Sequence, residues 1–592
     1  MTQTTIYRAR SILTMNPAQP RATHVAVRDG RILGAGPLEA LTGWGPYELD
    51  ERFAELVLMP GLVEGHSHVM EGSMWSFAYC GYFDRTDPEG RTWPGNPSIE
   101  AVVERLQRQA RETERGDADA PVTGWGVDPI HYGSRRISRA DLDAVSTERP
   151  VGILHASGHI INVNTRALEM AGLLRSGVDH PGIPLGDDGL PTGEMKGPEA
   201  MTPVGPVVGL DRQAYAGDAA ALRRFARLCV RTGVTTATDL AAMLTPESVA
   251  MMSEVTGEAD YPARIVALRR NIGVPVEQLV ANVQAFKSSS HDRLRLGAIK
   301  IHADGSIQGF SARMRWPGYY DGAPNGLWYT PPEQMRETYR RALETGIQVH
   351  THANGDEAID LVLDSMAWAL ERHPVADHRF TIQHGQLADA AQLRRARALG
   401  MCVNLFPNHH FYWGDQHRAM TVGPERAERM NPCATALALG VPLAIHSDAP
   451  ITPLGPLFTA WCAVNRLTAS GRVLGHAERI PVADALRTIT LGAAYTLHLD
   501  GEIGSIECGK QADFAVLHDD PEAVGAEGSR TSRSGARSVA GASSRPTPPE
   551  AIGRLRARAE SERRAPIARG VRVDFDPGRN QGRAPRRDPK RG

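Results

Sequence analysis

Residues 56–69, LVLMPGLVEGHSHV, indicate the fold that we expect for this chain of 592 residues. An apolar run ends in the pair His66 and His68, and side chains two positions apart on a strand point to the same side. Two imidazoles at this spacing can hold one metal ion through their ring nitrogens. The segment therefore predicts a buried strand with a metal site at its end, although an isolated HxH pair is a weak signal.

Seven further apolar runs follow the same plan along the chain. Most of them are preceded by a predicted helix, and Gly233 and Gly346 stand where two of these helices should end. The runs are VTTATDL (234–240), ARIVAL (263–268), RLGAIKI (295–301), IQVHTHA (347–353), RFTIQHG (379–385), MCVNLF (401–406) and VPLAIHSD (441–448). With the first run, this alternation of strands and helices predicts a (β/α)8 barrel, and the alternative is an open doubly wound sheet.

Polar residues at the carboxyl ends of the later strands favour the barrel. Lys300, His352, His384 and Asp448 end the fourth, fifth, sixth and eighth predicted strands, with His350 as an alternative to His352. In a barrel the carboxyl ends of all strands meet at one mouth, where catalytic groups from several strands gather. Packing explains each of these residues taken alone, but together they indicate one site.

Lys300 differs from the other residues because an ammonium group has no lone pair for a metal ion. It could be a simple ion-pair lysine. After reaction with CO2, however, its amine becomes a carbamate, a bidentate anion that can bridge two cations. Its position in a ring of metal-binding side chains makes the carbamate the better hypothesis.

The two ends of the chain and one long connection complete the predicted organisation. HVAVRDGRILGAG (24–36) predicts a hairpin at Asp29-Gly30, and GEIGSIECGKQADFAVLHDD (501–520) is also strand-rich, so the two could form one small β-domain. The stretch between His68 and Val234 is far too long for an ordinary connection between a strand and a helix. We expect it to be an inserted subdomain over the barrel mouth.

Charge and composition exclude several classes of partner. The formal net charge is −2, but residues 521–592 carry 17 Lys and Arg against 8 Asp and Glu, which leaves −11 for the main body. An acidic main body does not suit nucleic acid. The basic tail is poor in large apolar residues, so we expect it to be disordered and solvated, with anion or nucleic-acid binding as the alternative.

Cysteine usage and hydropathy predict a cytoplasmic protein that does not enter a membrane. The six cysteines include no CxxC pair, which is typical of a chain in a reducing compartment. No apolar run is long enough for a membrane span, and the N-terminus lacks the features of a signal peptide. The expected partner is a small-molecule substrate, and a homodimer is compatible with the sequence.

The segments PGLVEGHSH, KIHADGS, HANGD, QHG and HSDAP resemble the signature segments of the amidohydrolase superfamily. Within it, they most resemble amidohydrolase family 3, whose YtcJ-like proteins include N-substituted formamide deformylases. The resemblance extends from about Ile6 to Pro521. It implies a distorted (β/α)8 barrel beside a β-sandwich built from both chain ends. The expected domains are residues 1–58 and 491–520 for the sandwich, 59–490 for the barrel with its insertion at about 75–215, and 521–592 for the tail.

The resemblance also implies a centre with two divalent metal ions, zinc before manganese or iron. His66, His68 and Asp448 would bind the more buried ion, and His352 and His384 would bind the second. A CO2-derived carbamate on Lys300 would bridge them. A water activated to hydroxide would then cleave a non-peptide C–N bond in an amide, an N-formyl or N-acyl amine or a cyclic amide. Asp448 would act as general base and then as general acid.

Two other functions remain open from the residues alone. One is a deaminase or esterase with a single metal ion, in which Lys300 takes no part. The other is an inactive barrel that serves as an interaction protein, although no expected ligand is missing. Candidate substrate contacts, each of which could equally be structural, are Trp125, Asp128, His155, His159, His302, His409 and His410.

The sequence departs from the family pattern at three places. Glu64 replaces the usual aspartate two residues before the HxH pair, and His302 stands where an aromatic residue is more common. Related chains continue past ADFAVL with further strands, whereas SGARSVAGASSRPTPPE follows here. A shifted reading frame is one hypothesis for this end, and translation of the other frames tests it.

Overall fold

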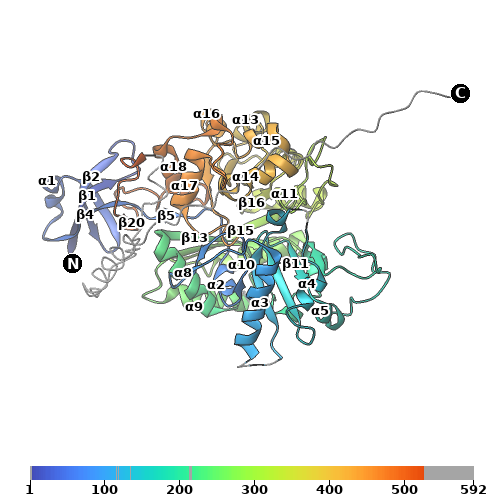
Figure 1. Cartoon of the computed structure of the whole chain (residues 1–592). Coiled ribbons are helices and arrows are strands. Elements are labelled where there is room, and N and C mark those ends of the chain that lie inside the picture. The colour runs from blue at the N-terminus through green and yellow to red at the C-terminus, as the bar shows by residue number, and fades with distance from the viewer. Residues whose placement is uncertain (1–2, 115–116, 118, 134, 212–216, 526–592) are drawn as a thin grey trace, which may run out of the picture. The chain divides into compact units, whose positions relative to one another are not determined.

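A single parallel sheet of eight strands forms the centre of the computed structural model, which describes residues 3–525 apart from 115–116, 118, 134 and 212–216. Its strand order is β19-β18-β17-β16-β15-β14-β13-β5, so that each strand lies beside its neighbour in the chain (Figure 1). The strands are β5 (Leu62–Val63), β13 (Val234–Ala242), β14 (Arg264–Arg270), β15 (Leu294–His302), β16 (Gln348–Ala353), β17 (Thr381–His384), β18 (Cys402–Leu405) and β19 (Leu443–Ile445).

Hydrogen bonds between the first and last strands close this sheet at its carboxyl end. Ser67 and Ala449, which follow β5 and β19, form a parallel bridge. The amide of Asp448 donates to the carbonyl of His66 (3.0 Å), and the amide of His68 donates to the carbonyl of Ala449 (2.7 Å). An open sheet would leave these two edges unpaired, so the architecture is the predicted TIM-like barrel.

Helices between the strands cover the outside of the barrel. In α11, the buried residues Met335, Thr338, Tyr339, Ala342 and Leu343 follow the spacing of one helix face, which explains why this segment packs as a helix. Gly233 and Gly346 end α8 and α11 in the left-handed conformation, as predicted. These helices include α8 (Ala219–Thr232), α9 (Pro246–Gly257), α10 (Val276–Lys287), α11 (Pro332–Thr345), α12 (Asp356–Arg372), α13 (Ala390–Ala398) and α16 (Cys433–Ala438).

The apolar run at 56–66 is divided between two sheets, so its prediction as one barrel strand was wrong. Its first half ends β4 (Tyr47–Pro60), which belongs to a sheet outside the barrel, and only Leu62 and Val63 join the barrel. The chain changes sheet at Gly61, where a Cβ would lie 2.0 Å from the Thr235 hydroxyl. Apolar residues fill both sheets, so the pattern does not reveal the change.

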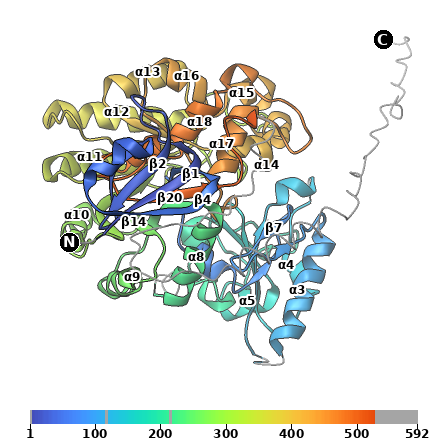
Figure 2. The same cartoon turned by 90° about the vertical axis from the view of Figure 1, so that its left-hand side faces the viewer.

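Both ends of the described chain meet in one five-stranded sheet, whose order is β20-β4-β1-β2-β3 (Figures 1 and 2). It contains β1 (Thr4–Leu13), β2 (Arg21–Arg28), β3 (Arg31–Gly36) and β20 (Phe514–Leu517) besides β4. Asp29 and Gly30 form the predicted hairpin, and both have positive φ. A second sheet that would complete a sandwich stays a prediction, and the expected tail from residue 526 lies outside the described residues.

The connection from β5 to β13 contains a third sheet of its own. Its order is β12-β11-β10-β9-β6, and its strands are β6 (Ala78–Tyr79), β9 (Val122–Val127), β10 (Val151–His155), β11 (Ile160–Val163) and β12 (Glu194–Lys196). Leu154 and Ile153 belong to two different hydrophobic clusters, so both faces of the sheet are buried. Helix α3 (Ile99–Glu114) contacts β9.

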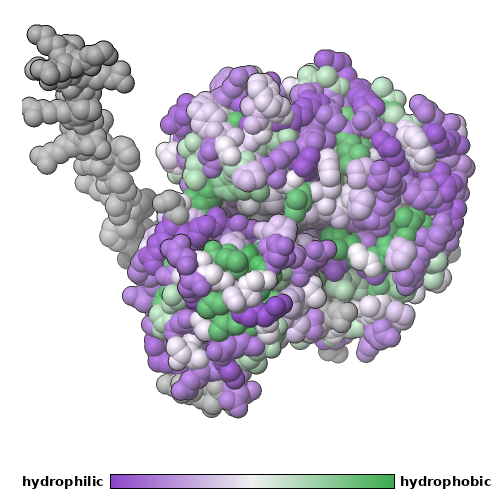
Figure 3. Space-filling model, turned by 90° about the vertical axis from the view of Figure 1, so that its right-hand side faces the viewer, coloured by the Kyte–Doolittle hydropathy of each residue, from purple (hydrophilic) through white to green (hydrophobic). Residues whose placement is uncertain are grey.

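The described helices include none that could cross a membrane. No helix among residues 3–525 combines the length and apolarity that a bilayer crossing requires. The face in Figure 3 is mainly hydrophilic, and its hydrophobic residues form small separate patches. Five of the six cysteines are buried, and Cys508 is exposed.

Candidate metal centre

Three predicted ligands from opposite ends of the chain converge where the barrel closes. His66, His68 and Asp448 each offer one ligand atom, and these atoms all lie within 4.8 Å of one another. Asp448 Oδ1 is 3.1 Å from His68 Nε2 and 3.4 Å from His66 Nε2. The hydrogen bonds that join β5 to β19 therefore also assemble a set of ligands that suits a divalent cation.

The tautomer of His66 is fixed by a buried amide. Gln383 Oε1 lies 2.8 Å from His66 Nδ1 and also accepts from Asn404 Nδ2 (2.9 Å). The other end of the same amide contacts His350 Nδ1 at 2.7 Å. Because the oxygen of Gln383 faces His66, the proton stays on Nδ1 and the lone pair of Nε2 points to Asp448.

The two histidines of the HxH pair have opposite electrostatic surroundings. Burial, together with the charge of Lys300, holds the pKa of His66 well below its usual value, so this ring is neutral. Burial also lowers the pKa of His68, but a hydrogen bond to Asp448 and the negative charges of Asp448 and Asp239 outweigh it, so the net pKa is raised. Asp239 Oδ1 lies 3.8 Å from His68 Nδ1. The sequence prediction missed Asp239, which stands near the end of the second barrel strand.

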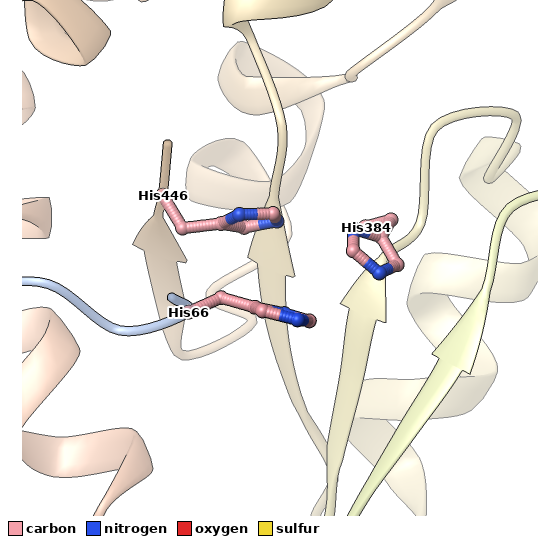
Figure 4. Close-up of side chains that lie close together, drawn as sticks. All are labelled: His66, His384 and His446. Carbon is pink, nitrogen blue, oxygen red and sulfur yellow. The ribbon is translucent and has the colours of Figure 1, made fainter. Parts of the chain in front are cut away.

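His446 is a further histidine that the sequence prediction missed. The ligand atoms of His66, His384 and His446 also lie within 4.8 Å of one another. The rings of His66 and His446 are stacked, and both extend toward His384 (Figure 4). His446 is two residues before Asp448, which is the same spacing that drew attention to His66 and His68. This spacing was the signal that could have identified it.

Lys300 lies in β15 with no solvent exposure. Its Nζ has no hydrogen-bond partner in the described part of the chain, and burial lowers its pKa to about 7. In the register of β15 with β16, Lys300 lies opposite His350. His302, two residues further along β15, lies opposite His352. A buried amine that lacks a partner is the group that a carbamate would require at this position.

His352 lies next to the two ligand clusters without belonging to either. Its ring centroid is 4.4 Å from that of His384 and 5.5 Å from that of His302. Its Nε2 is 3.2 Å from the carbonyl of Gly305 and 3.1 Å from Asn354 Nδ2. The role of His352 as a ligand of a second ion therefore stays a prediction.

Two residues of the centre have strained backbones. His384 and Asp448 have φ values of 71° and 54°, in the left-handed region that non-glycine residues rarely adopt. Each such residue costs about 1–3 kcal/mol, and such strain is concentrated at functional sites. The hydrogen bond from the Asp448 amide to the carbonyl of His66 contributes to holding this strained backbone.

A cavity opens from His66, His68 and Asp448 between the barrel and the inserted sheet. Four of the predicted substrate contacts line it, and apolar side chains make up much of the remaining wall. The predicted contacts are Trp125, His155, His159 and His302, and the apolar residues include Met70, Met74, Leu154, Met243, Met251 and Met252. Residues of the β5–β13 connection therefore form one wall of this cavity.

Three other candidate contacts lie outside the lining of this cavity. Asp128 accepts hydrogen bonds from Trp413 Nε1 (3.0 Å) and from the amide of Ile130 (3.3 Å). His409 Nδ1 is 3.0 Å from His417 Nε2, and His410 is buried beside Asn431. The structure thus gives these residues partners within the fold.

Known proteins are similar to this chain in sequence and in fold. The profile of the amidohydrolase family matches residues 54–539. The putative amidohydrolase YtcJ of Bacillus subtilis is 28% identical over 534 residues, which cover 88% of this chain and 95% of that protein. The N-substituted formamide deformylase of Arthrobacter pascens is 25% identical over 527 residues, which cover 86% and 92%.

A solved structure agrees with this result at the level of the fold. The crystal structure of an uncharacterized metal-dependent hydrolase from Pyrococcus horikoshii superposes with a TM-score of 0.67 at 21% identity. The superposition covers 89% of this chain and 99% of that one. The barrel, the ligands at its closure and the match over most of the sequence lead to one conclusion: the chain belongs to the amidohydrolase family.

Proposed function

We propose that this chain hydrolyses a non-peptide C–N bond, in an amide, an N-formyl or N-acyl amine or a cyclic amide. The observation that carries the proposal is the convergence of His66, His68 and Asp448 at the floor of a cavity. The name of the Arthrobacter pascens relative, N-substituted formamide deformylase, supports this substrate class.

We further propose a centre of two divalent metal ions with a carbamate on Lys300 between them. The fully buried amine of Lys300 and the unpaired nitrogens of His384 support this assignment. Imidazole and carboxylate ligands suit zinc, and also manganese or iron. When bound, the ions would lower the pKa of a water molecule and polarise the substrate carbonyl.

The side chains of this centre divide the work of hydrolysis. Gln383 holds the proton of His66 on Nδ1 and so keeps Nε2 available as a ligand atom. Asp448 lies at the cavity floor, where its carboxylate accepts a proton and returns it to the leaving nitrogen. The apolar wall keeps water away from these charges and so strengthens their interactions.

Metal analysis followed by a substrate screen tests the proposal. We expect two equivalents of metal in the purified chain and turnover of N-formyl or N-acyl amines. Asp448→Asn should abolish turnover but retain most of the metal, whereas Asp415→Asn, at a surface carboxylate paired with Ser470, should remain active. Absence of bound metal, or no turnover across the screen, would contradict the proposal, and an active Asp448→Asn variant would contradict the role of this residue.

Two measurements distinguish this proposal from a one-metal deaminase or esterase: the number of bound metal ions and the metal content of a Lys300→Ala variant. Under our proposal, Lys300→Ala loses metal and activity, and a short carboxylate such as propionate restores both in part. A single equivalent of metal, together with a Lys300→Ala variant that keeps it, would instead favour the one-metal enzyme.

A further inference from the structure

Arg85 is a buried residue of the β5–β13 connection that binds two other segments of the chain at once. It begins β7 (Arg85–Thr86), which pairs with β8 (Thr92–Trp93), and it is 5% exposed. Its Nη2 lies 2.6 Å from Oε1 of Glu71, which is 1% exposed. Its Nη1 donates to the carbonyl of Pro450 at 2.7 Å. The guanidinium group therefore connects a buried carboxylate to a backbone carbonyl.

Both partners of Arg85 stand beside proposed ligands of the more buried metal ion. Glu71 begins α2 (Glu71–Met74), three residues after His68. Pro450 follows Asp448 by two residues. These two segments are the ones that pair where the barrel closes, so Arg85 joins them by a second set of contacts outside the sheet.

The backbone around Asp448 needs such support. Its φ of 54° is strained, and its carbonyl accepts from the amide of Ile451 at 2.7 Å, so residues 448–451 form a tight turn. Pro450, whose carbonyl Arg85 binds, is the third residue of this turn. A strained conformation persists only where the surrounding structure holds it. The contact with Arg85 therefore contributes to the position of the Asp448 carboxylate, which lies 3.1 Å from His68 Nε2.

A simple ion pair with Glu71 does not account for all contacts of the guanidinium group. Its Nη2 also lies 3.4 Å from the carbonyl of Thr452, and its carbon lies 4.8 Å from the ring centroid of Trp125, which lines the main cavity. A planar guanidinium can bind a carboxylate and a carbonyl in a fixed geometry, whereas the ammonium group of a lysine is a single point charge. The contacts of Arg85 use this geometry.

We propose that Arg85 is a positioning residue that fixes Asp448 at the metal centre. The β5–β13 connection then contributes to metal binding in addition to forming a wall of the cavity. This inference rests on the metal centre proposed above, because Asp448 is one of its ligands. It predicts that loss of the guanidinium group weakens metal binding although no ligand is changed.

Arg149→Ala is the matched control for Arg85→Ala. Arg149 lies in the same connection and also donates to backbone carbonyls, those of Ala110 (3.0 Å) and Ala120 (2.8 Å), but these belong to the connection itself. Metal-free proteins are titrated with zinc against a chromophoric chelator. We expect Arg85→Ala to lose about 10- to 100-fold in zinc affinity, as is typical when a residue that orients a ligand is removed. Arg149→Ala should stay within about threefold of the natural chain.

Added guanidinium ion gives a second readout that does not depend on activity. Arg85 lines a small second cavity, which gives the ion a route to the vacated position. At concentrations far below those that unfold the chain, guanidinium should restore part of the zinc affinity of Arg85→Ala and should not change that of Arg149→Ala. If Arg85→Ala does not fold, Arg85→Lys takes its place in the titration, because lysine keeps a charge beside Glu71 but loses the paired contacts.

The outcomes separate this inference from the proposed metal centre. Zinc affinity within threefold of the natural chain after substitution of Arg85, an equal loss in Arg149→Ala, or no rescue by guanidinium would overturn the positioning role and leave the metal centre standing. Failure of the natural chain to bind zinc would refute both.

Discussion

Removing the side-chain amide of Gln383 should weaken metal binding although no metal-ligating residue is changed. In Gln383→Leu, His66 Nδ1 and His350 Nδ1 lose their buried partner, whereas Asn404 Nδ2 keeps a second acceptor in the carbonyl of Gly65. Two orphaned groups at about 1–3 kcal/mol each should lower the free energy of unfolding by about 2–6 kcal/mol. His66 is then free to carry its proton on either nitrogen, so zinc affinity should fall by about 10- to 100-fold.

Gln383→Glu is the matched control for this prediction. It keeps an oxygen opposite His66 and Asn404, and the second oxygen can accept from His350 after a change of tautomer. Zinc competition and thermal unfolding of both variants check the expectation that the Glu variant binds zinc more tightly than the Leu variant. The reasoning would be refuted if Gln383→Leu bound zinc within threefold of the natural chain, or if both variants lost the same affinity.

Three further predictions address metal linkage, pH dependence and packing. Chelation should lower the melting temperature, because an ion at 100 times its Kd stabilises the fold by about 2.7 kcal/mol; a melting curve unchanged by chelator would contradict this. Burial raises the pKa of Asp128 from 3.8 to about 7, so its protonated form contributes stability that is fully present below pH 4 and is lost as pH rises through 7. The stability of the natural chain relative to Asp128→Asn should therefore fall by up to about 4 kcal/mol between pH 4 and 8 in denaturant titrations, and a constant difference would argue against the shift. In Gly72→Ala the new Cβ would lie 1.9 Å from the carbonyl oxygen of Ala221, so the variant should lose about 1–3 kcal/mol of stability in thermal unfolding, and an unchanged melting temperature would contradict this.

The barrel strands could be predicted from the sequence because parallel strands buried on both faces are almost continuously apolar. The runs at 263–268 and 295–301, for example, became β14 (Arg264–Arg270) and β15 (Leu294–His302). The first run was assigned wrongly, since the same apolar residues fill two sheets and only the close approach at Gly61 separates them. Local composition carries no information about which of two sheets a strand joins.

Several residues of the metal centre could be predicted because they stand at strand ends, although His446, which follows β19, and Asp239 were missed. His66, His68 and Asp448 stand at strand ends, and the structure brings them together. Gln383 could not be predicted in this way, because the sequence does not show which side chain its amide contacts. That partner, His66, is 317 residues away in the chain.

The sequence alone determined the family, the eight-strand plan and the types of side chain that could bind metal. Tertiary structure decided which nitrogen of His66 is free, how His446 joins the other rings and which candidate contacts reach the cavity. The physical reason is that these properties depend on hydrogen bonds and packing between strands far apart in the chain. The pairing of the segments that follow β5 and β19 brings His66 and Asp448 together. The sequence of either segment alone does not reveal this pairing.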